Sequence, residues 1–259
     1  MTQTGKLIYT ELQSIANGIG KFHNGDYIRE QDAVDCVKDL IKSLRRENET
    51  CNIRRFLGQA QVLQEDLVPL IVYYGRADEE LFEVTIRCLM NLTQPARIVF
   101  KNEVPQDQST RHCYIQVEEY LQEYKQAFVN EQFLKVLSEK LAYFLELSWE
   151  ERSEDQNVLI ERLLVLLRNI LHVAATDVDR LRTDDDASTH DQIVWQMHQA
   201  VWTNLSSTSP RQMMRGGLLS MCWRSFLSCL EIRRLNSCRL PVLLAVVERK
   251  RETSRSWPG

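Results

Sequence analysis

Apolar residues recur at helical spacing along most of the chain. In residues 7–20 and 32–46 they fall three or four positions apart, so each segment has one apolar face. Segments of this kind predict helices over 7–20, 32–46, 57–63, 66–75, 78–95, 109–128, 133–147, 154–173 and 191–198. No stretch alternates clearly between apolar and polar residues. We therefore expect residues 6–199 to be mostly helical and to form no sheet.

The segment 154–173 differs from the others because it is apolar around most of its circumference. A helix of that kind is buried on two sides, between neighbours. We expect its core positions to be Leu163, Leu166, Leu167 and Ile170. Helix after helix with short connections is typical of helical hairpins that stack into a solenoid, which leaves a long surface for partners.

Helix boundaries are marked by residues with the chemistry of caps and breakers. The predicted N-caps are Asp66, Asp78, Ser109 and Thr189. Gly75 and Pro95 are predicted to end helices, and Asn24-Gly25-Asp26 to break the first one.

Composition supports long helices and an intracellular setting. Only 9 glycines and 6 prolines occur in 259 residues, which leaves few turn-formers for a many-stranded protein. The first residues lack a basic stretch followed by an apolar one, so we expect no secretory signal. No run of 18 apolar residues occurs, so we expect no membrane span. Seven irregularly spaced cysteines then indicate reduced thiols.

No motif in the sequence supports catalysis, a cofactor or a metal. A phosphate-binding glycine loop, GxSxG and HExxH are all absent. His190 and His198 are two helical turns apart, and Asp184–Asp186 are explained more simply as an acidic loop before a helix N-terminus than as a metal site. We expect His172 to be a packed residue of an apolar helix. The cysteines Cys222, Cys229 and Cys238 lack the paired spacing of a zinc site.

Five strings, in this order, resemble the amino-terminal region of one family. They are CVKDLIKSLRRENET (36–50), LGQAQVLQEDLVPLI (57–71), CLMNLTQPA (88–96), LIERLLVLLRNILHV (159–173) and DDDASTHDQ (184–192). The family is Timeless, which comprises eukaryotic replication-fork and clock-related proteins. The resemblance runs from about residue 10 to Ala200 and is closer to vertebrate fork-type members than to insect clock-type members.

The resemblance implies a fold and a role. It implies that residues 1–200 form an all-α, armadillo- or HEAT-like solenoid without enzymatic activity, cofactor or small-molecule substrate. Its implied partners are Tipin and the helicase and polymerases of the replisome, with duplex DNA contacted weakly or indirectly and no membrane. The implied setting is the nucleus, in fork pausing, the DNA damage checkpoint and cohesion, with a circadian role as the clock-related alternative.

The last part of the chain changes character. Residues 1–200 hold 33 acidic and 22 basic side chains, whereas residues 201–259 hold ten basic ones, three glutamates and no aspartate. When the reading frame of Ser220–Arg239 is shifted by two bases, Met221-Cys222 necessarily becomes Val. One consistent choice of codons then gives VLEIVSLMFRDQTPEQL, which resembles the family's continuation. We therefore expect 201–259 to be a frame-shifted or mis-spliced, poorly ordered tail that is not native sequence.

Another interpretation of the tail is a genuine basic segment that grips the phosphate backbone of DNA. The chain would then be a DNA-binding module. The acidic balance of residues 1–200 argues against autonomous affinity for DNA. If the tail is not native, the helix at 191–198 lacks its natural successor, and we expect Ile193, Val194 and Met197 to be partly uncovered.

Deletion of residues 201–259 tests the frame interpretation. A tail that selection never shaped packs against nothing, so we expect the melting temperature of the remainder to stay unchanged. Restoring the frame should raise it, because the end of a solenoid needs a cap. A melting temperature several degrees lower after the deletion would identify the tail as packed native structure. The transcript across the codons for Gln199 to Thr203 provides an independent check.

Overall fold

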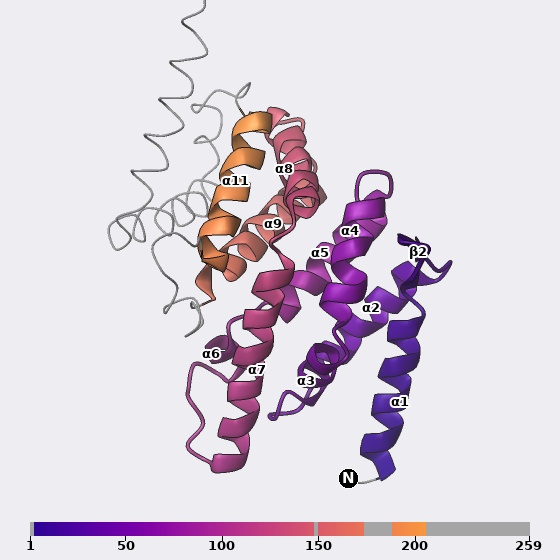
Figure 1. Ribbon diagram of the computed structural model, residues 1–259, viewed down its shortest axis with the longest axis vertical. Helices are drawn as coiled ribbons and strands as arrows, with labels where there is room; N and C mark the ends of the chain where they lie inside the picture. The colour runs from indigo at the N-terminus through magenta and orange to yellow at the C-terminus, as the bar shows by residue number, and fades with distance from the viewer. Residues whose placement is uncertain (1–2, 148–149, 174–187, 206–259) are drawn as a thin grey trace, which may run out of the picture.

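The computed structural model describes residues 3–147, 150–173 and 188–205 (Figure 1). Its helices are α1 (Gln3–Asn17), α2 (Ala33–Leu44), α3 (Asn52–Gln59), the π-helical turn η1 (Leu63–Leu67), α4 (Val68–Tyr74), α5 (Glu79–Leu92), α6 (Ala96–Val99), α7 (Gln108–Ala127), α8 (Glu131–Glu146), α9 (Glu154–His172) and α11 (Thr189–Leu205). Two short strands are β1 (Gly20–His23) and β2 (Asp26–Arg29). The prediction of a mostly helical chain is confirmed.

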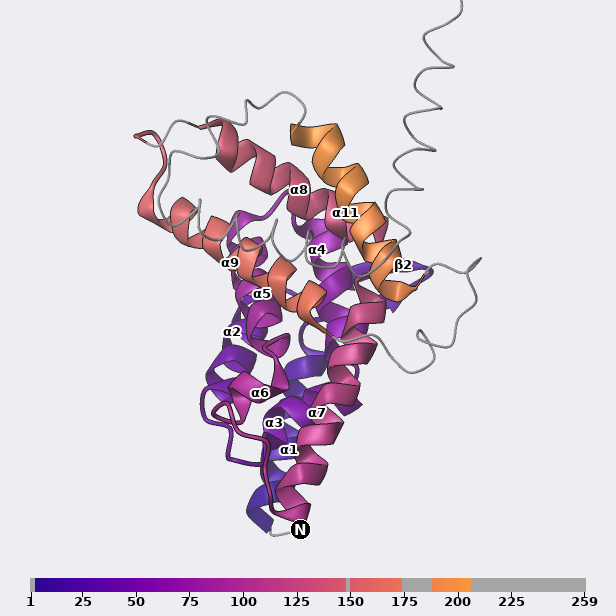
Figure 2. The same ribbon diagram turned by 90° about the vertical axis from the view of Figure 1, so that its left-hand side faces the viewer.

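The helices stack on neighbours that are distant in the sequence, as in a solenoid. Helix α5 packs against α2 on one side and α9 on the other, and α4 packs against both α5 and α8. Helix α3 lies against α7, and α11 lies along α8 (Figure 2). One apolar core runs through all these contacts, from Leu12 to Met197. The predicted core positions of α9 are all buried, and the helix packs against both α5 and α8, which confirms that it is covered from two sides.

The expectation that no sheet forms is wrong, because β1 and β2 make an antiparallel hairpin. Gly20 pairs with Arg29 and His23 with Asp26, so only Asn24 and Gly25 form the loop. Their φ angles are 53° and 95°. A two-residue loop with positive φ at both positions matches the right-handed twist of a hairpin, and Asn-Gly is the sequence that favours it. The predicted break at Asn24-Gly25-Asp26 is therefore this turn.

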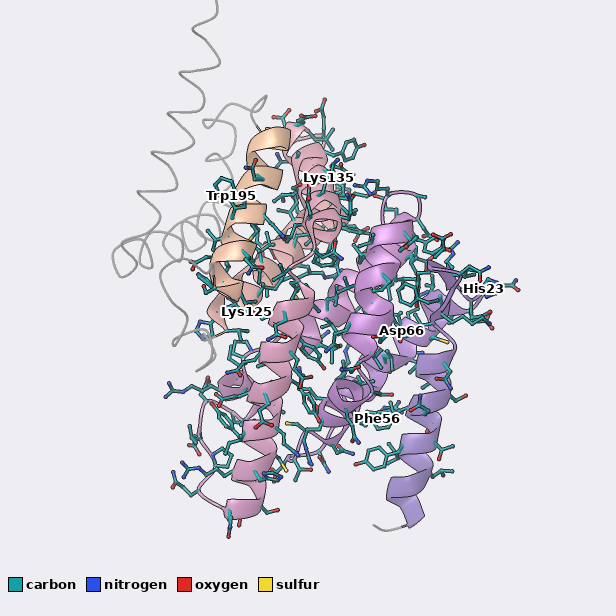
Figure 3. All side chains as sticks on the ribbon, viewed as in Figure 1. His23, Phe56, Asp66, Lys125, Lys135 and Trp195 are labelled. Atoms are coloured by element: carbon teal, nitrogen blue, oxygen red, sulfur yellow. The ribbon has the colours of Figure 1, made fainter. Side chains whose placement is uncertain are left out.

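Tyr27 of β2 anchors the hairpin to the helices. Its side chain is buried, and its hydroxyl donates a hydrogen bond at 3.0 Å to the carboxylate of Asp66, a residue labelled in Figure 3. The Tyr74 hydroxyl donates to the backbone carbonyl of Tyr27 at 3.2 Å. An added Cβ on Gly20 would lie 2.5 Å from the Tyr27 hydroxyl oxygen, so a residue without a side chain is required there.

Asp66 is not the helix N-cap that the sequence predicted. It lies inside η1, which runs directly into α4, and its carboxylate is used by Tyr27 instead. The prediction failed because an Asp before an apolar run matches the pattern of a cap. A hydrogen bond from a residue 39 positions away is not visible in that pattern.

The other predicted boundaries fall close to the observed ones. Asp78 caps α5 by accepting a hydrogen bond from the Leu81 amide at 2.9 Å, as predicted. Gly75 follows the last residue of α4, and Pro95 lies just beyond the end of α5. At two other helices the cap is an earlier neighbour of the predicted one.

At α7 the cap is Asp107 and not Ser109, because the Asp107 carboxylate accepts from the Thr110 amide at 3.0 Å. At α11 the Ser188 hydroxyl, not Thr189, accepts from the Asp191 amide at 3.1 Å. Both differences move the start of the helix by one or two residues without changing which segment is helical.

The expectation that the apolar residues of α11 are partly uncovered is wrong for Ile193 and Met197 and holds for Val194. Ile193 and Met197 are 0% and 4% exposed, and Val194 is half-buried. The reason is that α11 lies along α8, which supplies the apolar surface that a later helix was expected to provide. Among the described residues no helix has the length and apolarity that crossing a membrane requires.

The Tyr27–Asp66 contact predicts a pH dependence of stability. Burial raises the pKa of Asp66 from 3.8 to about 6, partly offset by the hydrogen bond from Tyr27. The folded protein then binds more protons than the unfolded chain between about pH 4 and pH 6, so the contribution of Asp66 to stability falls as pH rises through that window.

Asp66→Asn keeps a carbonyl acceptor for the Tyr27 hydroxyl but cannot ionise. We expect the variant to melt at a higher temperature than the parent at pH 7.5. This advantage should disappear below about pH 4, where Asp66 is neutral in both states. Melting curves across this range check the prediction, and a difference that does not change with pH contradicts it.

Candidate partner-binding groove

Three of the five strings that carry the family resemblance meet at the carboxyl end of α5. Arg54 of α3 donates from one guanidinium nitrogen to the backbone carbonyls of Asn91 and Leu92, at 3.1 Å for Leu92. Asn169 of α9 donates to the carbonyl of Met90 at 3.4 Å. The last carbonyls of a helix have no partner within it, and a cation there also interacts favourably with the helix dipole.

The charge on Arg54 is balanced by Glu47. The two side chains form an ion pair at 3.1 Å, and both are largely excluded from solvent. Thr93 completes the arrangement, since its hydroxyl donates to the Leu89 carbonyl at 2.8 Å and lies 3.4 Å from the Asn169 amide nitrogen. These residues hold α3, α5, α9 and the loop that follows α2 together, so the strings include a structural centre.

Lys125 is a second buried cation that donates to a backbone carbonyl at the end of a helix. Its side chain is buried in α7, and its ammonium donates to the backbone carbonyl of Val173 at 2.6 Å, just past the end of α9. Buried cations thus satisfy the carboxyl ends of both α5 and α9.

The residues considered for metal or packing roles occupy different places. His172 is exposed in the last turn of α9, so the expectation that it is packed is wrong: its side chain lies on the outer face of the helix. His190 is half-buried, while the side chain of His198 and the residues Asp184–Asp186 lie outside what the structure describes. Within the described residues, no group of three side chains could hold a metal ion.

Two thiols of the described residues are buried and have raised pKa values. Burial raises the pKa of Cys88 to about 12 and that of Cys51 to about 11, so both remain protonated at neutral pH. Cys222, Cys229 and Cys238 lie outside the described residues.

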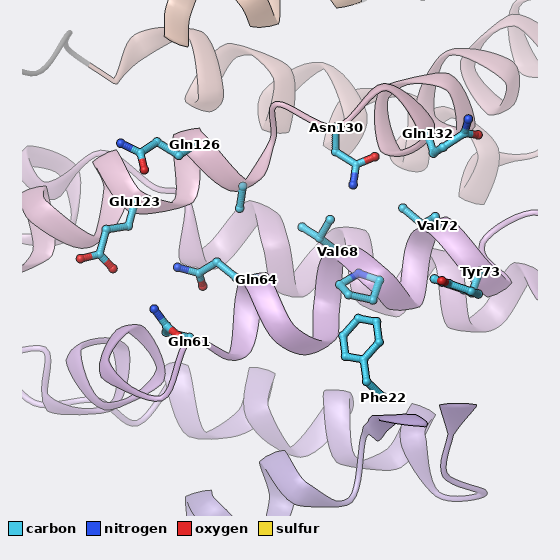
Figure 4. A pocket seen from close by; sticks show the side chains of 12 residues that line it. Phe22, Gln61, Gln64, Val68, Val72, Tyr73, Glu123, Gln126, Asn130 and Gln132 are labelled. Atoms are coloured by element: carbon cyan, nitrogen blue, oxygen red, sulfur yellow. The ribbon is translucent and has the colours of Figure 1, made fainter. Parts of the chain in front are cut away.

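A surface hollow of about 590 Å³ separates the hairpin from the junction of α7 and α8 (Figure 4). Its base is apolar and consists of Val68, Pro69 and Val72 on α4. Two aromatic side chains, Phe22 of β1 and Tyr73 of α4, flank it and are 50% and 46% exposed. Exposed aromatic groups beside an apolar base are typical of contact surfaces for other molecules.

The rim of this hollow is made mostly of carboxamides. They are Gln61, Gln64, Gln126, Asn130 and Gln132. Glu123 is the one charged residue that lines it. A carboxamide can both donate and accept hydrogen bonds without carrying charge. The hollow therefore suits the binding of a neutral polar chain better than it suits chemistry on a substrate.

Sequence reasoning did not find this hollow. Its walls come from β1, η1, α4, α7 and α8, which come together only in the folded chain. The one available signal was Asn24-Gly25, since a predicted hairpin would have placed Phe22 on an exposed strand.

Comparison with known proteins identifies the family. The sequence model described as Timeless protein matches residues 26–208. The chain is 46% identical over 206 residues to the Protein timeless homolog of Mus musculus, an alignment that covers 78% of this chain and 17% of the relative. It is 47% identical over 188 residues to the human homologue, which covers 73% of this chain and 15% of the relative.

The chain belongs to the Timeless family.

Two relatives of lower identity are also similar to the chain. Identity is 29% over 168 residues to Protein timeless of Drosophila melanogaster, which covers 64% of this chain and 12% of the relative. The chain is 27% identical over 195 residues to Topoisomerase 1-associated factor 1 of Coccidioides immitis. This alignment covers 70% of the chain and 16% of that relative. The higher identity to the mammalian members confirms the predicted resemblance to vertebrate-type Timeless.

The chain spans about a sixth of the length of these mammalian relatives. The Timeless match starts at residue 26, so Phe22 lies outside it, whereas the residues of the hollow on η1, α4, α7 and α8 lie inside it. The match ends at residue 208 and α11 runs to Leu205, both past the domain boundary predicted at residue 200. That boundary, and the frame-shifted tail beyond it, stay predictions.

Substitution of Arg54 tests the structural centre. Arg54→Met removes the donors to the end of α5 and leaves the Glu47 carboxylate buried without a partner, a change that costs about 3–5 kcal/mol. Arg54→Lys keeps the charge but not the planar fork, so we expect a smaller loss. Urea unfolding measures both.

A control for this substitution is the double variant Glu47→Gln/Arg54→Met. It removes the unpaired carboxylate, so it should recover part of the stability that Arg54→Met loses. Equal stability of the parent and Arg54→Met would show that α5 is held by other contacts.

Proposed function

We propose that the chain is part of a non-enzymatic scaffold of the replication fork protection complex, which pairs with Tipin and acts in the nucleus. Membership in the Timeless family carries this proposal. The scaffold stabilises and pauses replication forks and supports checkpoint signalling, through contacts with the helicase and polymerases of the replisome. A contribution to the circadian clock is the secondary role.

The architecture supports contact and not catalysis. Stacked helices present a long surface, and the hollow beside the hairpin offers exposed aromatic groups and uncharged polar ones. Among the described residues the buried cations are engaged in holding helix ends, and the two most shifted thiols are protonated at neutral pH. The two cations satisfy carbonyls that have no partner within their own helices.

One relative supports a partner associated with DNA. The fungal relative is called Topoisomerase 1-associated factor 1. We extend to this chain only the general role that this name gives, association with a protein that acts on DNA. The acidic balance of residues 1–200 makes protein contact a better explanation of such an association than direct binding to phosphates.

Binding to purified Tipin, in nuclease-treated samples, tests the proposal. We expect the full chain to bind Tipin at micromolar or lower concentration, with an affinity that DNA does not change. Absence of binding to Tipin contradicts the pairing. Salt-dependent binding of the chain to duplex DNA, without Tipin, would instead support the DNA-binding alternative, which uses the basic tail.

A further inference from the structure

A second hollow, of about 300 Å³, lies between α1, α3 and α7. The rings of Tyr9 on α1 and Phe56 on α3 are stacked there, with centroids 5.3 Å apart. Phe56 is labelled in Figure 3. Tyr120 of α7 forms another wall. This hollow thus also combines aromatic groups with an open face.

The two hollows follow one another along the same two walls, although no residue lines both. On one wall Gln59 of α3 lines the second hollow, and Gln61, two residues later, lines the first. On the other wall Tyr120 and Glu123 of α7 lie one helical turn apart, one in each hollow. At a rise of about 1.5 Å per residue, the stretch of α7 from Gln116 to Ala127 covers about 16 Å.

The lining has an unusual chemistry. Eight of the nineteen residues that line the two hollows are asparagine or glutamine. Some are used within the protein: Gln116 accepts from Arg55, and Asn130 caps α8. In the described part of the chain, Gln59, Gln61 and Gln126 make no side-chain hydrogen bond. Their donors and acceptors match those of a peptide group.

Charge excludes other kinds of ligand. Arg55 and Glu123 are the two charged residues in the lining, and they have opposite signs. The Arg55 guanidinium already donates to the Gln116 side chain at 2.7 Å and to the Thr50 carbonyl at 3.4 Å. Nucleic acids and acidic peptides need an excess of cations, which this lining lacks. The five aromatic residues instead favour apolar side chains.

We propose that the two hollows form one groove that binds an extended, uncharged segment of a partner protein. The carboxamides pair with the backbone of the segment, and an aromatic or aliphatic side chain enters each hollow. An extended chain advances about 3.3 Å per residue, so about five residues cover the shared wall. The inference rests on the proposed function only in that the chain acts by contact with other proteins.

The probe is a phage-displayed library of random seven-residue peptides, selected against the full chain. We expect enriched sequences to carry few aspartates and glutamates, and to carry two aromatic or aliphatic residues several positions apart. The best binder is then synthesised, together with a copy methylated on its backbone nitrogens. Loss of backbone donors should weaken binding about two- to tenfold for each hydrogen bond removed.

Variants test whether one peptide occupies both hollows. Gln59→Ala and Gln126→Ala each lie in a different hollow and are exposed, so neither should unfold the protein. We expect each to weaken binding of the same peptide about two- to tenfold. Gln108→Ala, on α7 outside the groove, is the matched control and should bind as the parent does.

Substitutions of two exposed aromatic residues provide a second test variant and its control. Tyr73→Ser removes an aromatic wall of the groove, while Tyr143→Ser removes a ring of similar exposure on α8, outside the groove. Only Tyr73→Ser should weaken binding of the peptide. The inference is overturned if no peptide is enriched, if the peptide responds to one hollow alone, or if single-stranded dT12 binds with higher affinity than the peptide.

Failure of the groove and failure of Tipin pairing can be told apart. If the Gln59→Ala/Gln126→Ala variant binds Tipin normally but not the peptide, the groove serves another segment and Tipin pairing stands. If Tipin fails to bind while the peptide tests succeed, the groove stands and the pairing is wrong.

Discussion

The carboxyl end of α5 is the point on which the rest of the structure depends. A helix that ends inside a core has carbonyls that water cannot reach, and each unpaired one costs free energy. Arg54 and Asn169 reach these carbonyls from α3 and α9, helices far apart in the sequence. Because a buried guanidinium needs a counter-charge, Glu47 is held there as well. Packing around α5 is therefore fixed by polar geometry as much as by apolar contact.

The groove is a consequence of this arrangement. With α3 and α9 fixed to α5, helix α7 packs against α3 and η1, and α8 packs against α4. These contacts place the two walls of the groove. The hairpin completes the rim because Tyr27 is tied to Asp66, which brings Phe22 beside Val68 and Pro69. Binding groups thus stand on rigid elements, which reduces the entropy lost when a partner binds.

The helices and their core were predictable because burial of one face imposes a period that the sequence displays. Leu163 and Ile170 are buried as their spacing required. The hairpin was missed because its strands are only four residues long, too short to show alternation. Asp66 and the groove could not be predicted from local patterns. Tyr27 comes close to Asp66 only through tertiary packing, and the same packing brings α7 to the other walls of the groove.

Native-state hydrogen exchange tests the central role of α5 most directly. If Arg54 and Asn169 hold its carboxyl end, the amides of Leu89 to Leu92 and those of the middle of α9 should exchange only when the whole domain unfolds. The amides of α1 and of the hairpin, which lie at one end of the stack, should exchange through smaller openings of lower free energy (Figure 1). Exchange at Leu89 to Leu92 as fast as in α1 would contradict the account.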